Sequence, residues 1–256
     1  NPILSQRHLP AERPFKVDWA GHADLVEGPD GQYYGVFLAI RPNEENRVNT
    51  GRETFILPVD WSGTFPVFKG GLEPIQPKLA MPQGAKNETG KNGYFPNGNF
   101  TFTETFTGSS LDYRWVGVRG AREGFISTTA EGLTITPYET NIKAALPTST
   151  LFYRQQHLNF TATTTLKYIP RTEKDLAGIT CYQSEKFNYV FGVTKKAEDS
   201  YIVLQRTEKG ESSTIASEKI EGNTPISLRV TAEGDKYTFS YSIKDDNYQT
   251  VGGTVS

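Results

Sequence analysis

Hydrophobic and polar positions alternate along much of the chain, and this period of two predicts β-strands. The clearest runs are residues 159–169, "NFTATTTLKYI", and residues 235–244, "DKYTFSYSIK". Alternation of β-branched and aromatic residues with polar ones is typical of half-buried antiparallel strands. Helical periodicity is nearly absent, so the chain is predicted to be all-β. The residues predicted to share one face are Phe160, Ala162, Leu166 and Tyr168 in the first run, and Tyr237, Phe239, Tyr241 and Ile243 in the second.

A change of composition divides the chain. Residues 69–99, "KGGLEPIQPKLAMPQGAKNETGKNGYFPNGN", are dense in Gly, Pro, Lys and Asn. Proline lacks the ladder N–H and glycine weakens a strand, so this stretch predicts a connector. The predicted organisation is a short β-rich part over residues 1–75, a linker over residues 76–98, and a β-sandwich over residues 99–256.

The N-terminal part has too much apolar strand for its length. Residues 21–42 predict a hairpin whose second strand, Tyr33–Ile40, is nearly continuously apolar, and "RETFILPVDW" predicts another strand. A continuously apolar strand is covered on both faces. Three or four strands within residues 1–75 cannot supply both covers. This part is therefore predicted to be a piece of a larger sheet assembly.

Composition excludes several classes of function. The net charge of -2 lacks the basic excess of a nucleic-acid binder. No apolar run approaches the roughly 20 residues of a membrane-spanning helix, so no membrane partner is expected. The single cysteine, Cys181, excludes an intrachain disulfide and a Cys-based zinc site, and predicts a small buried hydrophobe in a strand. A chain without disulfides is compatible with the cytoplasm, the periplasm or the outside of the cell.

Several motifs, in order, resemble one enzyme family. "NPILSQRHL", "GHADLV", "YYGVFLAIRP" and "NTGRETFILPVDW" resemble the closing part of the five-bladed propeller of family 43 glycoside hydrolases, in the subgroup of β-xylosidases and α-L-arabinofuranosidases. "FTETFTGSSLDYRWVGVRG", "LFYRQQHLNFTATTTLKYIP", "AGITCYQ" and "KYTFSYS" resemble that subgroup's accessory domain. The implied fold is all-β: a partial five-bladed β-propeller segment followed by a concanavalin A-like β-sandwich of jelly-roll type. One departure is Ser5-Gln6, which stands where the family pattern has Thr-His.

The resemblance gives His22, in "GHADLV", a place on the propeller axis beneath the active site. There the matching histidine is a ligand of a central calcium, or of a water bound to it. Calcium is thus the structural ion implied for the intact enzyme. Because calcium takes six to eight oxygens, none is expected for this fragment alone. From the residues alone, a hydrogen-bonded core histidine remains the alternative, and Asp24 is interpreted as a turn or ladder-end carboxylate.

Arg52, in "NTGRETF", is the second residue to which the resemblance gives a role. The matching arginine reaches the pocket that holds the terminal sugar. A planar guanidinium suits this task because its donors can grip adjacent hydroxyls. The alternative is a surface ion pair with Glu53 or another acid.

No catalytic residue is predicted within residues 1–256. Hydrolysis in family 43 inverts the anomeric centre and needs a carboxylate base, a carboxylic acid and a third aspartate. The resemblance places all three upstream of the "NPIL" segment, and Glu27, Glu53 and Asp60 occupy other motif positions. The fragment is therefore expected to be inactive alone. The family pattern also continues beyond "YQTVGGTVS" into another strand.

The function implied by the resemblance is the C-terminal portion of an inverting exo-glycosidase from a bacterium. Its expected partners are a xylo-oligosaccharide or arabinoxylan-derived sugar, the missing N-terminal propeller part, and a second copy in a homo-oligomer. One alternative is a stand-alone, non-catalytic carbohydrate-binding β-sandwich, suggested by the 12% aromatic content; another is an adhesion sandwich. Strand spacing favours the core instead for five aromatic residues: Phe100, Phe102, Tyr168, Tyr189 and Phe191.

Overall fold

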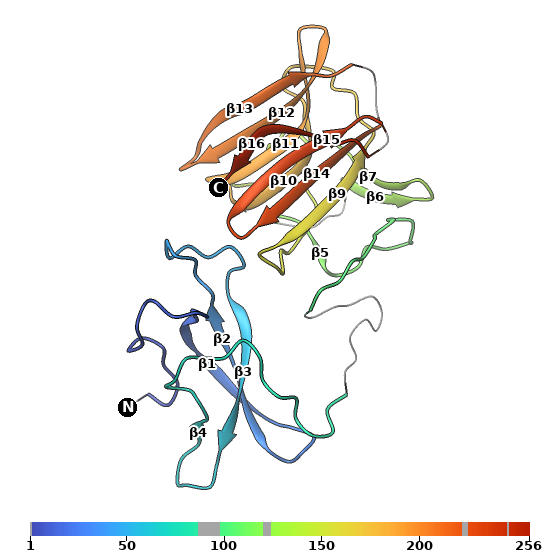
Figure 1. The fold of residues 1–256 in the computed structure, drawn as a ribbon. Helices are drawn as coiled ribbons and strands as arrows, with labels where there is room; N and C mark the ends of the chain where they lie inside the picture. Colours follow the sequence, from blue (N-terminus) through green and yellow to red (C-terminus); the bar gives the residue numbers. More distant parts are fainter. Residues whose placement is uncertain (1, 87–97, 120–123, 222–224, 245) are drawn as a thin grey trace. The chain divides into compact units, whose positions relative to one another are not determined.

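The computed structural model describes residues 2–86, 98–119, 124–221, 225–244 and 246–256 (Figure 1). Within these ranges the chain forms β-strands and no helix, which confirms the all-β prediction. Accordingly, no helix in the described ranges could cross a membrane. The chain divides into two compact units, Asn1–Thr103 and Glu104–Ser256. Residues 87–97 of the predicted linker lie outside the described residues, so the linker stays a prediction.

The N-terminal unit is a single antiparallel sheet whose strands follow chain order. The strands are β1 (Asp18–Glu27), β2 (Tyr33–Ile40), β3 (Glu53–Asp60) and β4 (Val67–Phe68). The bounds of β2 coincide with the predicted apolar strand. A four-stranded antiparallel meander has the form of a β-propeller blade, and we call this sheet the blade.

The two faces of this blade differ in their cover. Phe37, Ala39, Leu57 and Val59 point to one face and are buried there, because other segments of the same unit pack over them. Ile56 points to the opposite face and is 41% exposed. On that opposite face, however, Tyr34 and Ile40 near the two ends of β2 are buried. Within the described part of the chain, the predicted cover is thus complete on one face and partial on the other. The covering side chains come from before β1 and after β4: Val17 and Ile75, with Leu4 and Phe15 at the margin.

Gln6 ties the N-terminal segment to the chain that follows β4. Its side chain is almost fully buried, at 2% exposure. The amide nitrogen donates to the Glu73 carbonyl at 2.7 Å and to the Gly71 carbonyl at 3.4 Å, while the amide oxygen accepts from the Ile75 N–H at 3.3 Å. Because one amide both donates and accepts, it satisfies buried backbone groups of both polarities. The residue that departs from the family pattern therefore has a structural role here.

We expect Gln6→Ala to destabilise the N-terminal unit by about 1–3 kcal/mol, because it leaves the buried Ile75 N–H and the partly buried Glu73 carbonyl without their partner. Urea unfolding followed by the fluorescence of Trp19 and Trp61 measures the change. Gln76→Ala is the matched control, since Gln76 is exposed and its amide donates only to the Pro74 carbonyl. Equal effects of the two substitutions would contradict the role given to Gln6.

The C-terminal unit is built around two four-stranded antiparallel sheets (Figure 1). The first sheet has the order β10 (Leu176–Ser184), β11 (Phe187–Lys196), β12 (Asp199–Glu208), β13 (Glu211–Lys219). The second has the order β16 (Gln249–Val255), β15 (Lys236–Ser242), β14 (Ile226–Glu233), β9 (Phe160–Leu166). Two small ladders accompany them: β5 (Trp115–Val116) with β8 (Phe152–Tyr153), and β6 (Ile126–Thr129) with β7 (Gly132–Ile135).

The core of this unit lies between the two sheets. Phe239 on β15 is fully buried, and its ring centroid lies 5.5 Å from that of Phe191 and 5.7 Å from that of Tyr189, both on β11. Phe191 is also fully buried, and Tyr189 packs against the same cluster. The predicted core assignment of these two aromatic residues is therefore confirmed. Phe102 differs, since it is 37% exposed.

Most of the alternating residues lie where the pattern predicts. Phe160, Ala162 and Leu166 pack against the core from β9. Tyr237, Phe239 and Tyr241 do so from β15, as predicted. The prediction was wrong for Ile243, which follows the end of β15 and is 45% exposed. Tyr168 likewise lies beyond β9, where its hydroxyl donates to Asp175 at 3.2 Å. In both cases the apolar alternation continues past the last ladder pair.

Cys181 lies on β10, partly buried against the sandwich core. Burial raises the pKa of its thiol to about 12, so the thiol is neutral at physiological pH. A neutral thiol is a poor nucleophile. Cys181 therefore behaves as the small hydrophobe that the sequence predicts.

Candidate functional site

His22 lies on β1, the free edge of the blade, and its side chain is exposed. Its backbone has φ 55°, and the β1–β2 register shifts between Asp18 and Gly21 and again between Gly21 and Asp24. Two bulges therefore interrupt the strand. Bulges re-aim side chains and are frequent beside active sites. A spacing of two along the sequence consequently does not place His22 and Asp24 on one face.

Arg52 is exposed and immediately precedes β3. The neighbouring Glu53 is bound by Arg41, whose Nε lies 2.9 Å from Oε1 and whose Nη2 lies 2.7 Å from Oε2. The Thr50 hydroxyl donates to Glu53 Oε1 at 2.7 Å. The alternative Arg52–Glu53 ion pair therefore does not form. Among the described residues, Arg52 has no acidic partner at ion-pair distance.

The register shows how far apart the two predicted residues lie. His22 falls between the pairs Gly21–Leu38 and Asp24–Val36, and Arg52 is next to the pair Ala39–Glu53. Strand β2 separates them. Their backbones are thus roughly 10 Å apart across two strand spacings and about 10 Å apart along the strand direction. His22 and Arg52 both lie in the half of the blade away from the β1–β2 turn, but they do not contact each other.

The residues of this blade do not assemble a calcium site. In the described part of the chain, no group of three or more His, Cys, Asp and Glu side chains converges to hold a metal. Calcium requires six to eight oxygen ligands, and His22 offers only imidazole nitrogens. Any calcium near His22 would depend on oxygen ligands from other residues.

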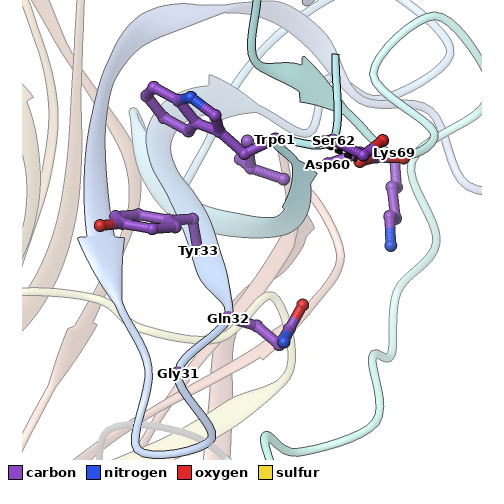
Figure 2. Close-up of a pocket in the computed structure, with 8 residues that line it drawn as sticks. Gly31, Gln32, Tyr33, Asp60, Trp61, Ser62 and Lys69 are labelled. Atoms are coloured by element: carbon purple, nitrogen blue, oxygen red, sulfur yellow. Dashed lines mark hydrogen bonds between the residues drawn. The ribbon is translucent and has the colours of Figure 1, made fainter.

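A surface depression lies at the opposite end of the blade, where β2 begins and β3 ends (Figure 2). Its volume is about 330 Å³. We call it the Trp61 depression. The polar and aromatic side chains that line it are Gln32, Tyr33, Asp60, Trp61, Ser62 and Lys69.

Two exposed aromatic rings form one side of the Trp61 depression. Trp61 is 48% exposed and Tyr33 is 40% exposed, and their ring centroids lie 5.2 Å apart at 46°. On the other side, the Ser62 N–H donates to Asp60 Oδ1 at 2.9 Å. This backbone hydrogen bond, with the Ser62 hydroxyl and the positive charge of Lys69, lowers the pKa of Asp60. Sequence reasoning missed this site, although the placement of Trp61 at the very end of a predicted strand was an available signal.

Comparison with known proteins identifies the C-terminal unit. Residues 103–256 match the family model described as "Beta xylosidase C-terminal Concanavalin A-like domain". The chain belongs to this family. The predicted concanavalin A-like sandwich is thereby confirmed, and the two facing sheets of residues 104–256 are its framework.

Whole-chain comparisons extend the match to the N-terminal unit. The chain is 27% identical to a non-reducing end α-L-arabinofuranosidase of Bacteroides ovatus, over 100% of this chain and 46% of that protein. It is 29% identical to a xylosidase/arabinosidase of Butyrivibrio fibrisolvens, over 96% of this chain and 46% of that protein.

A solved structure shows the same relation. The crystal structure of a GH43_12 protein retrieved from a capybara gut metagenome matches 100% of this chain and 48% of its own, with 48% sequence identity and a TM-score of 0.89. This chain thus spans about half the length of the relatives that it matches. These comparisons confirm the resemblance to family 43 glycoside hydrolases. They also confirm the predicted fold, in which a propeller segment is followed by a sandwich.

Proposed function

We propose that this chain is the C-terminal portion of an inverting exo-glycosidase that hydrolyses xylo-oligosaccharides or arabinofuranosyl side chains. The observation that carries the proposal is the match of nearly the whole chain to about half of enzymes named as arabinofuranosidase and xylosidase/arabinosidase. The catalytic carboxylates then belong to residues outside this chain. Hydrolysis of aryl xylosides and aryl arabinofuranosides by the full-length protein is the test, and its absence would overturn the proposal.

The exposed apolar side chains and the unpaired edge strand of the blade support this proposal. One face is covered by the chain's own segments, whereas the other leaves Ile56 exposed. Strand β1 has no strand paired to its outer side among the described residues, and Leu25 and Val26 on it are 42% and 47% exposed. An edge strand with unpaired backbone groups and exposed apolar side chains is a surface on which further strands can pack. Further propeller blades are the partner that fits, because blades surround a central channel.

His22 and Arg52 have roles in this proposal that depend on those further blades. His22 sits on the free edge strand in a bulge, where its imidazole faces away from the blade's own core. Its proposed role is beneath the active site, as a ligand of a structural calcium or of its bound water. Arg52, exposed and without an acidic partner among described residues, is proposed to donate hydrogen bonds to the terminal sugar.

In the full-length enzyme, we expect Arg52→Ala to lower kcat/KM between tenfold and a hundredfold. The loss of a charge-assisted hydrogen bond to a buried sugar is worth about 1.5–3 kcal/mol. Initial rates on an aryl glycoside measure it. Arg47→Ala is the matched control, because Arg47 is a well-exposed arginine that pairs only with the equally exposed Glu45. Kinetics of Arg52→Ala that match those of Arg47→Ala would place Arg52 on the surface.

A further inference from the structure

The exposed rings of the Trp61 depression lie on the face of the blade that this chain covers by itself. Tyr33 pairs with Val59, so the two side chains point to the same face of the sheet. Trp61 follows two residues after Val59 and continues that face. Val59 belongs to the core covered by the unit's own segments. The two rings thus lie just beyond the end of that cover.

The rings do not share a face of the sheet with the exposed Ile56. The side chain of Ile56, which is 41% exposed, points opposite to those of Leu57 and Val59. Tyr33 and Trp61 are therefore not exposed for the same reason as Ile56. A cover over Ile56 alone would leave the rings open.

The polar groups around the rings supply both donors and acceptors. Figure 2 shows Tyr33 and Trp61 on one side, with Asp60, Ser62 and Lys69 across from them. The Ser62 N–H fixes the Asp60 carboxylate, which is a hydrogen-bond acceptor. The Lys69 N–H donates to the Pro58 carbonyl at 2.9 Å, which fixes the backbone that carries its ammonium donor. Gln32 is exposed and offers an amide that both donates and accepts.

We propose that the Trp61 depression is a second, non-catalytic binding site for a sugar unit of a xylan-type chain. A sugar ring has apolar C–H faces that stack on aromatic rings, and a rim of hydroxyls that hydrogen-bond to carboxylate, amide and ammonium groups. Tyr33 and Trp61 supply the first surface, and Asp60, Gln32 and Lys69 supply the second. The volume of about 330 Å³ is at the lower end of ligand sites, which span roughly 300–1,000 Å³, and suits one or two rings of a longer chain.

The site is distinct from the one proposed around Arg52. Tyr33 and Ala39 lie at opposite ends of β2, and Arg52 is next to the partner of Ala39. Six residues of strand separate the two ends by about 20 Å. A sugar chain held at the Trp61 depression would therefore raise the affinity for polymeric substrate without touching the reacting bond. The assignment to xylan rests on the proposed function; the assignment to a sugar rests on the rings and polar groups.

The test is binding of xylohexaose and soluble arabinoxylan to the 256-residue chain, by isothermal titration and affinity electrophoresis. We expect Trp61→Ala to weaken binding about tenfold or more, which corresponds to about 1.4 kcal/mol. Trp19→Ala is the matched control, because Trp19 is a 66% exposed tryptophan of the same sheet outside the depression. Gln32→Ala, whose exposed side chain makes no hydrogen bond with a described residue, should weaken binding severalfold while the fold is unchanged.

Each outcome decides the question. No binding of either sugar to the chain, or equal binding by Trp61→Ala and the unsubstituted chain, would overturn the proposal. Equal losses in Trp61→Ala and Trp19→Ala would do the same, and if Trp61→Ala unfolds, Gln32→Ala decides. Tighter binding of cellohexaose than of xylohexaose would overturn the assignment to xylan. Hydrolysis of aryl xylosides by the full-length enzyme tests the proposed function separately, because those substrates are too short to reach the depression.

Discussion

The 256-residue chain alone is expected to release no measurable nitrophenol from aryl xylosides or aryl arabinofuranosides. Inverting hydrolysis requires a general base and a general acid whose carboxyl groups stand roughly 6.5–9.5 Å apart. General acid–base groups contribute about 10²–10⁴-fold each, so their loss removes most of the rate enhancement. The largest effect that we expect is therefore the complete absence of turnover.

Two carboxylates of the blade, Glu53 and Asp60, have contacts that do not suit a catalytic role. Glu53 is occupied by Arg41 and Thr50. The backbone hydrogen bond from Ser62 lowers the pKa of Asp60, whereas a glycosidase general acid needs a raised pKa. Glu53 is thus held by its partners, and the pKa of Asp60 is shifted in the direction opposite to that of a general acid. Turnover by the chain that disappears on replacing one of its own carboxylates would contradict this assignment.

Replacement of Phe239 by alanine is expected to destabilise the C-terminal unit by about 3–5 kcal/mol. Phe239 is fully buried on β15, and its ring contacts the rings of Phe191 and Tyr189 on β11 of the facing sheet. Removal of the ring therefore opens a cavity between the two sheets. This loss is a large fraction of the roughly 5–15 kcal/mol by which a domain is stable.

Guanidinium unfolding followed by far-ultraviolet circular dichroism measures this loss. Thr164→Ala is the control, since Thr164 is exposed on β9 of the same sheet as Phe239 and should change the free energy of unfolding by less than about 0.5 kcal/mol. A loss below about 1 kcal/mol for Phe239→Ala would mean that the two sheets do not share a packed core.

The fold could be predicted largely from the sequence because burial imposes a period of two on each half-buried strand. Phe160, Ala162 and Leu166 pack into the core as predicted, and β2 has the predicted bounds. The errors are at strand ends, at Tyr168 and Ile243, where the alternation outlasts the ladder. The pattern of apolar and polar residues does not show at which residue the hydrogen bonds between paired strands end.

The candidate site was less predictable because it depends on pairing between strands. The bulges around His22 break the alternation, and the one signal of them in "GHADLV" is Gly21, because a glycine within a strand often marks a bulge. Glu53 binds Arg41, which lies across the β2–β3 pair, and not its chain neighbour Arg52. The Trp61 depression joins Tyr33 and Trp61, which are separated by 28 positions and meet only through the β2–β3 register. Local sequence carries no direct signal of such partners.

The stand-alone carbohydrate-binding module is a weaker account of the chain than the glycosidase portion. Strands β1–β4 form a blade with a partly exposed face and a bulged edge strand, which an isolated sandwich module does not need. The Trp61 depression lies on this blade and not on the sandwich. Sugar binding there is compatible with the enzyme, where it would add to the catalytic site.

The most direct test of the central claim is proton NMR of the sugar released by the full-length protein during the first minutes of reaction with an aryl β-xyloside or aryl α-arabinofuranoside, with the 256-residue chain measured alongside. We predict that the full-length protein releases the sugar first as the anomer opposite to that of the substrate, and that the chain alone releases none. Release first as the substrate's own anomer, or release by the chain alone, would contradict the account.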